Sequence, residues 1–166
     1  MLAPQTVIVN ILRHAIAEMK ETSHPDAERA LTREGRDKLR AILKRARRAD
    51  VSPSVILTSP LRRAVESAGI AAKIFRHKNE LVVTKALSPQ STPEKTWQEI
   101  RRHADQAEIL LTGHEPHLSK LTAYLLGFPG LAIEIKKGAL VRIRIDEISE
   151  KPKGVLEWML VPKLTI

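Results

Sequence analysis

Apolar runs alternate with stretches of helical spacing along most of the chain. Runs rich in apolar and β-branched residues, typical of buried strands, lie at residues 6–12, 54–58, 81–84 and 108–112. Between and after these runs apolar side chains recur at helical spacing, and the predicted helices begin after Thr32, at Ser59-Pro60, at Thr92-Pro93 and after Pro116. Such alternation is typical of βαβ units, so we expect a largely parallel sheet.

The end of the chain departs from this alternation. Residues 139–145 and 155–161 both have the pattern of strands, and only a polar turn at 146–153 separates them. They therefore predict an antiparallel pair. The whole pattern predicts one domain over residues 1–166, a three-layer α/β/α sandwich with helices on both faces of a mostly parallel central sheet.

Composition narrows the class of protein. Hydrophobic residues make up 43% of the 166 residues and aromatic residues only 3%, so we expect a sizeable aliphatic core. The chain has no cysteine, which excludes disulfides, thiolate metal sites and cysteine nucleophiles. It has no apolar stretch near the length of about 20 residues that spans a bilayer. No secretory signal is visible at the N-terminus, so we expect a cytoplasmic protein.

The formal net charge of +9 favours anionic partners. Phosphorylated proteins, small phosphate esters and nucleic acids all fit this charge. Nucleic acid is disfavoured, because single-strand binders stack bases on aromatic side chains and these are scarce here. The basic face of the predicted helix at 33–48 is either an ordinary solvated face or a docking surface for an acidic partner.

Three strand ends carry the candidate chemistry. Arg13-His14 follows the first apolar run, residues 58–64 (TSPLRRA) end the second, and residues 112–116 (TGHEP) end the fourth. Ligands bind at the carboxyl ends of strands in open α/β sheets. If the sheet is parallel, two histidines and at least two arginines meet in one pocket. Two helix N-termini, after Ser59 and after Pro116, would also favour an anion there.

This set of residue types suits phosphoryl transfer. Arginine forks bind phosphoryl oxygens bidentately, and a neutral imidazole can attack phosphorus and hold it as phosphohistidine. A second histidine, if protonated, can stabilise the transition-state oxygens. His114 and His117 could suggest a metal, but their spacing does not match the common zinc motif on a helix. No third ligand is evident, so we expect no metal and no cofactor.

Four segments, in the same order, resemble the histidine phosphatase (phosphoglycerate mutase-like) superfamily, and most closely its small SixA-type phosphohistidine phosphatases. They are residues 12–15 (LRHA), 29–35 (RALTREG), 58–64 and 111–116 (LTGHEP), and the resemblance covers nearly the whole chain. It implies a phosphoglycerate mutase-like fold, with His14 taking the phosphoryl group and Arg13, Arg63 and His114 binding it. Ala15 stands where the superfamily often has glycine, a variation associated with SixA-like members.

The resemblance also implies a function. We expect a metal-independent phosphatase that removes phosphoryl groups from phosphohistidine on signalling proteins, such as a histidine phosphotransfer domain. Short loops leave little material for a lid, which favours a protein substrate in an open pocket. Two alternatives stay open: a phosphatase of a small phosphorylated metabolite, and a module that binds phosphoproteins without turnover.

Many larger members of the superfamily carry a dedicated acidic residue that protonates the leaving group, and no matching motif stands out in this sequence. Glu18 and Glu115 are candidates only through their proximity in sequence. The P–N bond of phosphohistidine is labile, and its imidazole can leave without strong help from an acid. We therefore expect faster hydrolysis of phosphoramidates than of alkyl phosphate esters.

Overall fold

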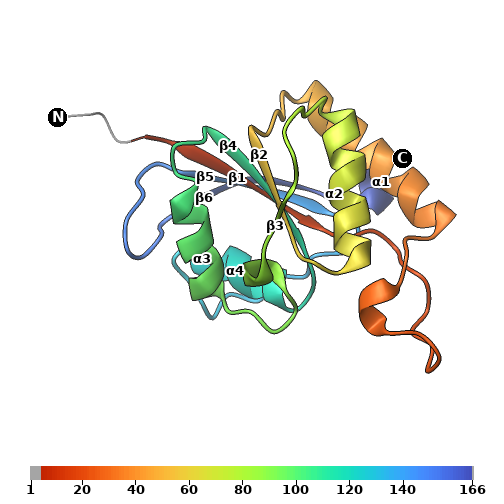
Figure 1. Ribbon diagram of the computed structural model, residues 1–166. Helices are drawn as coiled ribbons and strands as arrows, with labels where there is room; N and C mark the ends of the chain where they lie inside the picture. The colour runs from red at the N-terminus through yellow and green to blue at the C-terminus, as the bar shows by residue number, and fades with distance from the viewer. Residues whose placement is uncertain (1–4, 166) are drawn as a thin grey trace.

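A six-stranded sheet with the order β3-β2-β4-β1-β5-β6 crosses the middle of the molecule in the computed structural model, which describes residues 5–165 (Figure 1). Its strands are β1 (Val7–Arg13), β2 (Val55–Thr58), β3 (Val82–Val83), β4 (Glu108–Gly113), β5 (Leu140–Ile145) and β6 (Val155–Leu160). The helices are α1 (Arg33–Arg48), α2 (Arg62–Ile74), α3 (Pro93–Arg102) and α4 (His117–Leu125). Two short 3₁₀ turns, η1 (Asp26–Glu28) and η2 (Lys85–Leu87), lie between these elements, and a third, η3 (Pro162–Leu164), follows β6.

The strand directions confirm the predicted sheet. β4 pairs in parallel with both β1 and β2, and β2 pairs in parallel with β3. β5 runs antiparallel to both β1 and β6, so the last two strands form the expected antiparallel pair. In the register of β1 and β4, Arg13 lies opposite Gly113. The parallel pairing therefore brings the two histidine-bearing strand ends side by side.

Helices cover both faces of the sheet, with α1 and α2 on one side and α3 and α4 on the other (Figure 1). On the first side α1 buries Leu39, Ile42, Leu43 and Ala46, the positions that helical spacing selects in the sequence. On the second side Trp97 is 1% exposed, so this rare aromatic residue lies in the core. Within residues 5–165 no helix is long and apolar enough to cross a membrane.

The predicted start of α2 at Ser59-Pro60 is wrong, because α2 begins at Arg62. The backbone N–H of Ser59 still donates to the carbonyl of Thr112, at 3.0 Å, and so extends the ladder between β2 and β4. Leu61 then serves as the N-cap with extended backbone angles. This late start leaves Ser59 buried at the sheet edge and puts Arg63 in the first turn of α2.

Gly35, in the first turn of α1, packs directly on the backbone that follows His14. A Cβ at this position would lie 2.3 Å from the carbonyl oxygen of Ile16 and 2.9 Å from its nitrogen. Because these are backbone atoms, the chain must shift to accept a methyl group. We expect Gly35→Ala to lower the free energy of unfolding by about 1–3 kcal/mol, measured by urea denaturation.

Gly69, inside α2, is the matched control. Outside its own helix, an added Cβ there meets no heavy atom within 4 Å. Gly69→Ala should raise the free energy of unfolding by about 0.5–1 kcal/mol, through helix propensity alone. Shifts of the same sign and size in both variants would contradict the close approach at Gly35.

Candidate active site

His14 lies at the carboxyl end of β1 and is 6% exposed. Its Nδ1 is 2.7 Å from the carbonyl oxygen of Ala15, and its backbone N–H donates to the carbonyl of Gly113. A carbonyl oxygen can only accept, so Nδ1 carries the ring hydrogen and Nε2 keeps its lone pair. The fold thus holds one tautomer of His14, the one with a nucleophilic Nε2.

Arg63 reaches this lone pair from the first turn of α2. Its Nε donates to Nε2 of His14 at 3.3 Å, and its side chain is buried. The other two nitrogens contact Asp26: Nη1 donates to its carbonyl oxygen at 2.9 Å and Nη2 to its carboxylate at 3.2 Å. Arg63 is therefore fixed from both ends, by His14 and by Asp26.

Asp26 is a residue that the sequence reasoning missed. It lies in η1, and its carboxylate also pairs with Arg29 at 2.9 Å. Burial acts to raise its pKa, but the charges of Arg63 and Arg29 hold the pKa of Asp26 below its ordinary value. The only signal in the sequence is an acidic residue three positions before Arg29, at the edge of the 29–35 segment.

His114 follows β4 and packs against His14, with ring centroids 5.2 Å apart. Its Nε2 is 2.7 Å from Oγ of Ser59, while its Nδ1 is buried with no hydrogen-bond partner among the described residues. His14, Arg63 and His114 are therefore brought together as the sequence predicts, since Arg63 and His114 each contact His14.

Arg13 is oriented differently from these three residues. Its Nη1 donates to the carbonyl of Ile135 at 2.8 Å, and its Nε is buried without a partner in residues 5–165. No hydrogen bond joins Arg13 to His14, Arg63 or His114 within that range, although its charge is close enough to lower the pKa of His14. The expected arginine clamp is therefore only half assembled around His14.

Both site histidines are neutral at pH 7. Burial, together with the charges of Arg63, Arg13 and Lys137, lowers the pKa of His14 to about 4, although the hydrogen bond to the carbonyl of Ala15 acts to raise it. Burial, with His14 and Arg63, lowers the pKa of His114 to about 3. A neutral imidazole at His14 is the form that can act as a nucleophile.

The two glutamates near the site bind backbone groups. Glu18 accepts from the N–H of Ala30 at 3.1 Å, and Glu115 accepts from the N–H of Ser119 at 2.7 Å. Glu115 thus occupies part of the N-terminus of α4, while the N-terminus of α2 has no side-chain cap. Of the two helix N-termini expected to favour an anion, that of α2 fits the expectation better.

The side chain of His117 contacts Thr96. Its Nε2 is 2.8 Å from Oγ1 of Thr96, on the α3 side of the sheet. Within the described chain, no group of three or more histidine or carboxylate side chains is placed to hold a metal ion.

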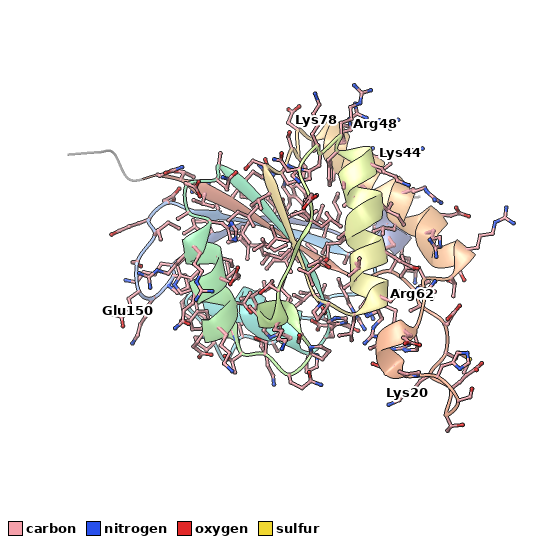
Figure 2. The ribbon with its side chains drawn as sticks, viewed as in Figure 1. Lys20, Lys44, Arg48, Arg62, Lys78 and Glu150 are labelled. Carbon is pink, nitrogen blue, oxygen red and sulfur yellow. The ribbon has the colours of Figure 1, made fainter. Side chains whose placement is uncertain are left out.

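Figure 2 shows where other cationic side chains lie around the helices. Arg62 projects from the end of α2 that carries Arg63, on the same side as Lys20. Lys44 and Arg48 lie toward the far end of α1. Arg62 is half exposed and pairs with Glu66 at 2.9 Å, as expected for a solvated helix residue.

Comparison with known proteins connects this geometry to a family. The profile described as "Histidine phosphatase superfamily (branch 1)" matches residues 9–88. An uncharacterized protein of Picosynechococcus sp. (strain PCC 7002) is 30% identical over 137 residues, which cover 80% of this chain and 81% of that protein.

Solved structures share the fold over almost the full length. The structure of the protein histidine phosphatase SixA complexed with tungstate superposes with a TM-score of 0.84 at 22% identity, covering 95% of this chain and 98% of SixA. The α-ribazole phosphatase of Shigella flexneri superposes with a TM-score of 0.71 at 15% identity, covering 94% and 97%. The family profile and the Picosynechococcus relative show that the chain belongs to the histidine phosphatase superfamily, and the chain also shares its fold with SixA.

Proposed function

We propose that the protein is a cytoplasmic phosphatase that hydrolyses phosphohistidine on signalling proteins, through a covalent phosphohistidine at His14. One observation carries the proposal: Nε of Arg13 and Nδ1 of His114 are both buried without a partner in residues 5–165. Such orphaned nitrogens are rare in folded proteins and destabilise them. A phosphoryl group at His14 would supply acceptor oxygens to both.

The first step uses the lone pair on Nε2 of His14. When a phosphoryl oxygen takes over the Nε hydrogen of Arg63, this lone pair becomes free to attack phosphorus. The new N–P bond forms as the bond from phosphorus to the leaving nitrogen or oxygen breaks. Nδ1 keeps its hydrogen, which it donates to the carbonyl of Ala15, so the phosphorylated ring is cationic.

Water completes the reaction. It attacks phosphorus, the cationic ring of His14 leaves as neutral imidazole, and phosphate departs after a proton passes to solvent. Arg63 remains paired with Asp26 and keeps its Nε hydrogen directed at the transferring oxygens. The cycle thus restores the starting tautomer of His14.

His114 fits the role of a neutral hydrogen-bond donor. Oγ of Ser59 accepts the N–H of Leu61 at 3.3 Å and has a hydrogen of its own that it can donate to Nε2 of His114. In the tautomer that accepts this hydrogen, the ring hydrogen of His114 is on Nδ1, the nitrogen without a partner among the described residues. The low pKa of His114 favours this neutral donor over the protonated form considered from sequence.

The leaving group argues for phosphohistidine as the substrate. An imidazole protonated on its other nitrogen leaves as a neutral molecule, whereas an alkoxide needs a proton from an acid. Asp26 stays ionised between two arginines, and Glu18 and Glu115 bind backbone N–H groups. The similarity to SixA, which is described as a protein histidine phosphatase, supports the same choice.

The decisive experiment compares substrates and variants. Phosphate release is followed from a phosphohistidine-bearing histidine phosphotransfer protein, from phenyl phosphate and from serine phosphate, with EDTA present. We expect release from the phosphotransfer protein to be fastest and from serine phosphate slowest. His14→Ala should lower turnover by more than about 10³-fold because the nucleophile is lost.

His24→Ala is the matched control for that experiment, because His24 is an exposed histidine. It should leave turnover unchanged, and circular dichroism should show that both variants fold. Normal turnover in His14→Ala would remove the proposed mechanism. Faster release from phenyl phosphate or serine phosphate would favour a small-metabolite substrate, and tight binding without release would favour a binding module.

Asp26 gives a second prediction, on the positioning of Arg63. Asp26→Asn keeps the size of the side chain but removes the charge that holds Arg63 and Arg29. We expect kcat on phenyl phosphate to fall about tenfold because Arg63 is less well aligned. KM should not rise, since a negative charge beside the phosphoryl group is also lost.

Glu18→Gln, in the same loop, is the control for Asp26→Asn and should change kcat less than twofold. A rise in KM with unchanged kcat in Asp26→Asn would show that Asp26 acts on substrate binding and not on the alignment of Arg63.

The buried neutral histidines predict a pH dependence of stability. The pKa of His14, about 4, lies below the value of about 6.5 in an unfolded chain. Below about pH 6.5 His14 takes up a proton in the unfolded chain but stays neutral in the folded protein. The free energy of unfolding therefore falls as the pH drops toward about 4. His114 adds to this fall.

Urea denaturation at several pH values measures this slope. His14→Asn should flatten it, because an amide does not titrate. The ion-paired Asp26 and Glu66 have lowered pKa values and lose their contributions only at more acidic pH. Equal slopes in wild type and His14→Asn would show that His14 is not the buried neutral group described.

A further inference from the structure

A groove of about 590 Å³ opens beside Arg13, on the side of its Ile135 contact. We call it the lysine groove after its cationic lining residues, which are Arg13, Lys38, Lys136, Lys137 and Lys163. These side chains come from four places, the end of β1, the N-terminal half of α1, the loop before β5, and η3. The groove is therefore built by the fold from segments far apart in the sequence.

Positive charge in the lysine groove is only partly balanced. Glu134 is the one carboxylate among its lining residues, and it pairs with Lys136. Lys38 pairs with Glu34 at 2.6 Å. Within residues 5–165, neither Lys137 nor Lys163 is in an ion pair, and both are exposed. The groove thus retains cations that can attract an anionic partner.

The loop that lines the lysine groove is hydrogen-bonded to the strand end that carries His14. The backbone N–H of Gly138 donates to the carbonyl oxygens of both Arg13 and His14, at 3.1 and 3.2 Å. The side chain of Arg13 binds the carbonyl of Ile135 in the same loop. A partner held in the groove would therefore lie next to the residue that takes the phosphoryl group.

The chemistry of the lining favours a protein segment over a second phosphate group. Lysines are point charges on flexible stems and can follow carboxylates whose positions vary, whereas bidentate phosphate binding typically uses arginine forks. Ile16, Val161 and Pro162 also line the groove and offer apolar contact to the aliphatic part of glutamate side chains.

We propose that the lysine groove is a docking site for an acidic segment of the phosphorylated protein, which it holds while the phosphohistidine meets His14. This inference rests on the proposed phosphatase function. Docking through several exposed charge pairs should raise the rate of encounter and be sensitive to salt. Small phosphate esters, which cannot reach the groove and His14 together, should gain nothing from it.

The test uses two synthetic peptides and two variants with equal charge change. One peptide carries phosphohistidine flanked by glutamates, and the other has glutamines in their place. The groove variant is Lys136→Glu with Lys163→Glu. The control is Arg48→Glu with Lys78→Glu, two exposed cations at the end of the molecule away from Arg62 (Figure 2).

We expect wild type to prefer the glutamate peptide by about tenfold in kcat/KM at low salt, and the preference to shrink at about 300 mM NaCl. The groove variant should lose this preference, while the control variant keeps it. Turnover of phenyl phosphate should stay within twofold in both variants. Equal effects of the two variants, or no preference in wild type, would overturn the proposal.

Two further outcomes separate the possible failures. If phenyl phosphate turnover fell with the groove variant, the lysine groove would belong to the catalytic site and not to docking. If wild type released no phosphate at all, the proposed function would fail. Docking would then be read from the fluorescence anisotropy of a labelled glutamate peptide with unphosphorylated histidine. Equal affinity for wild type and groove variant in that measurement would overturn the docking site itself.

Discussion

The hydrogen bond from Nε of Arg63 to Nε2 of His14 constrains the rest of the site. An arginine cannot give up its hydrogen, so His14 must present a lone pair and cannot be protonated while this contact exists. The carbonyl of Ala15 fixes the ring from the other side by accepting from Nδ1. Together the two contacts select one tautomer and one charge state, which are those of a nucleophile.

Hydrogen bonds donated by backbone N–H groups support this contact, in addition to the side chain of Asp26. The N–H of His14 binds Gly113, which ties the end of β1 to the end of β4. The ladder bond of Ser59 delays the start of α2 until Arg63 is in its first turn. Oγ of Ser67, one turn later in α2, accepts from the N–H of Ala15 at 3.1 Å. Each bond fixes a strand end or helix start, so the position of Arg63 relative to His14 follows from the fold.

The sequence predicts those parts of the site that periodicity and strand order determine. The apolar runs place the ends of β1, β2 and β4, and the parallel sheet brings His14, Arg63 and His114 together. Asp26 could not be found in this way, because it reaches Arg63 from an irregular loop whose path no local pattern encodes. The orientation of the Arg13 side chain could not be predicted either, since it depends on the carbonyl of Ile135, more than a hundred positions away in the sequence.

The start of α2 shows why local signals can mislead. Proline after serine is a good signal for a first helical turn. At Ser59, however, the backbone N–H continues the hydrogen bonding between β2 and β4, and the helix starts later. The charge state of His114 depends in the same way on tertiary structure, because burial beside His14 and Arg63 lowers its pKa. Propensity and spacing carry no information about either effect.

The unbalanced positive charge of the site explains why it suits transfer of a phosphoryl group. Two arginines flank His14, and the carboxylate of Asp26 contacts only one of them, Arg63. Such an arrangement works against folding, because burying cations without full compensation destabilises the native state. A bound phosphoryl dianion would offset the charge and, by binding only the folded protein, stabilise it. The same electrostatic imbalance that weakens the free protein would therefore contribute to phosphoryl binding, which is the trade between stability and function expected at an active site.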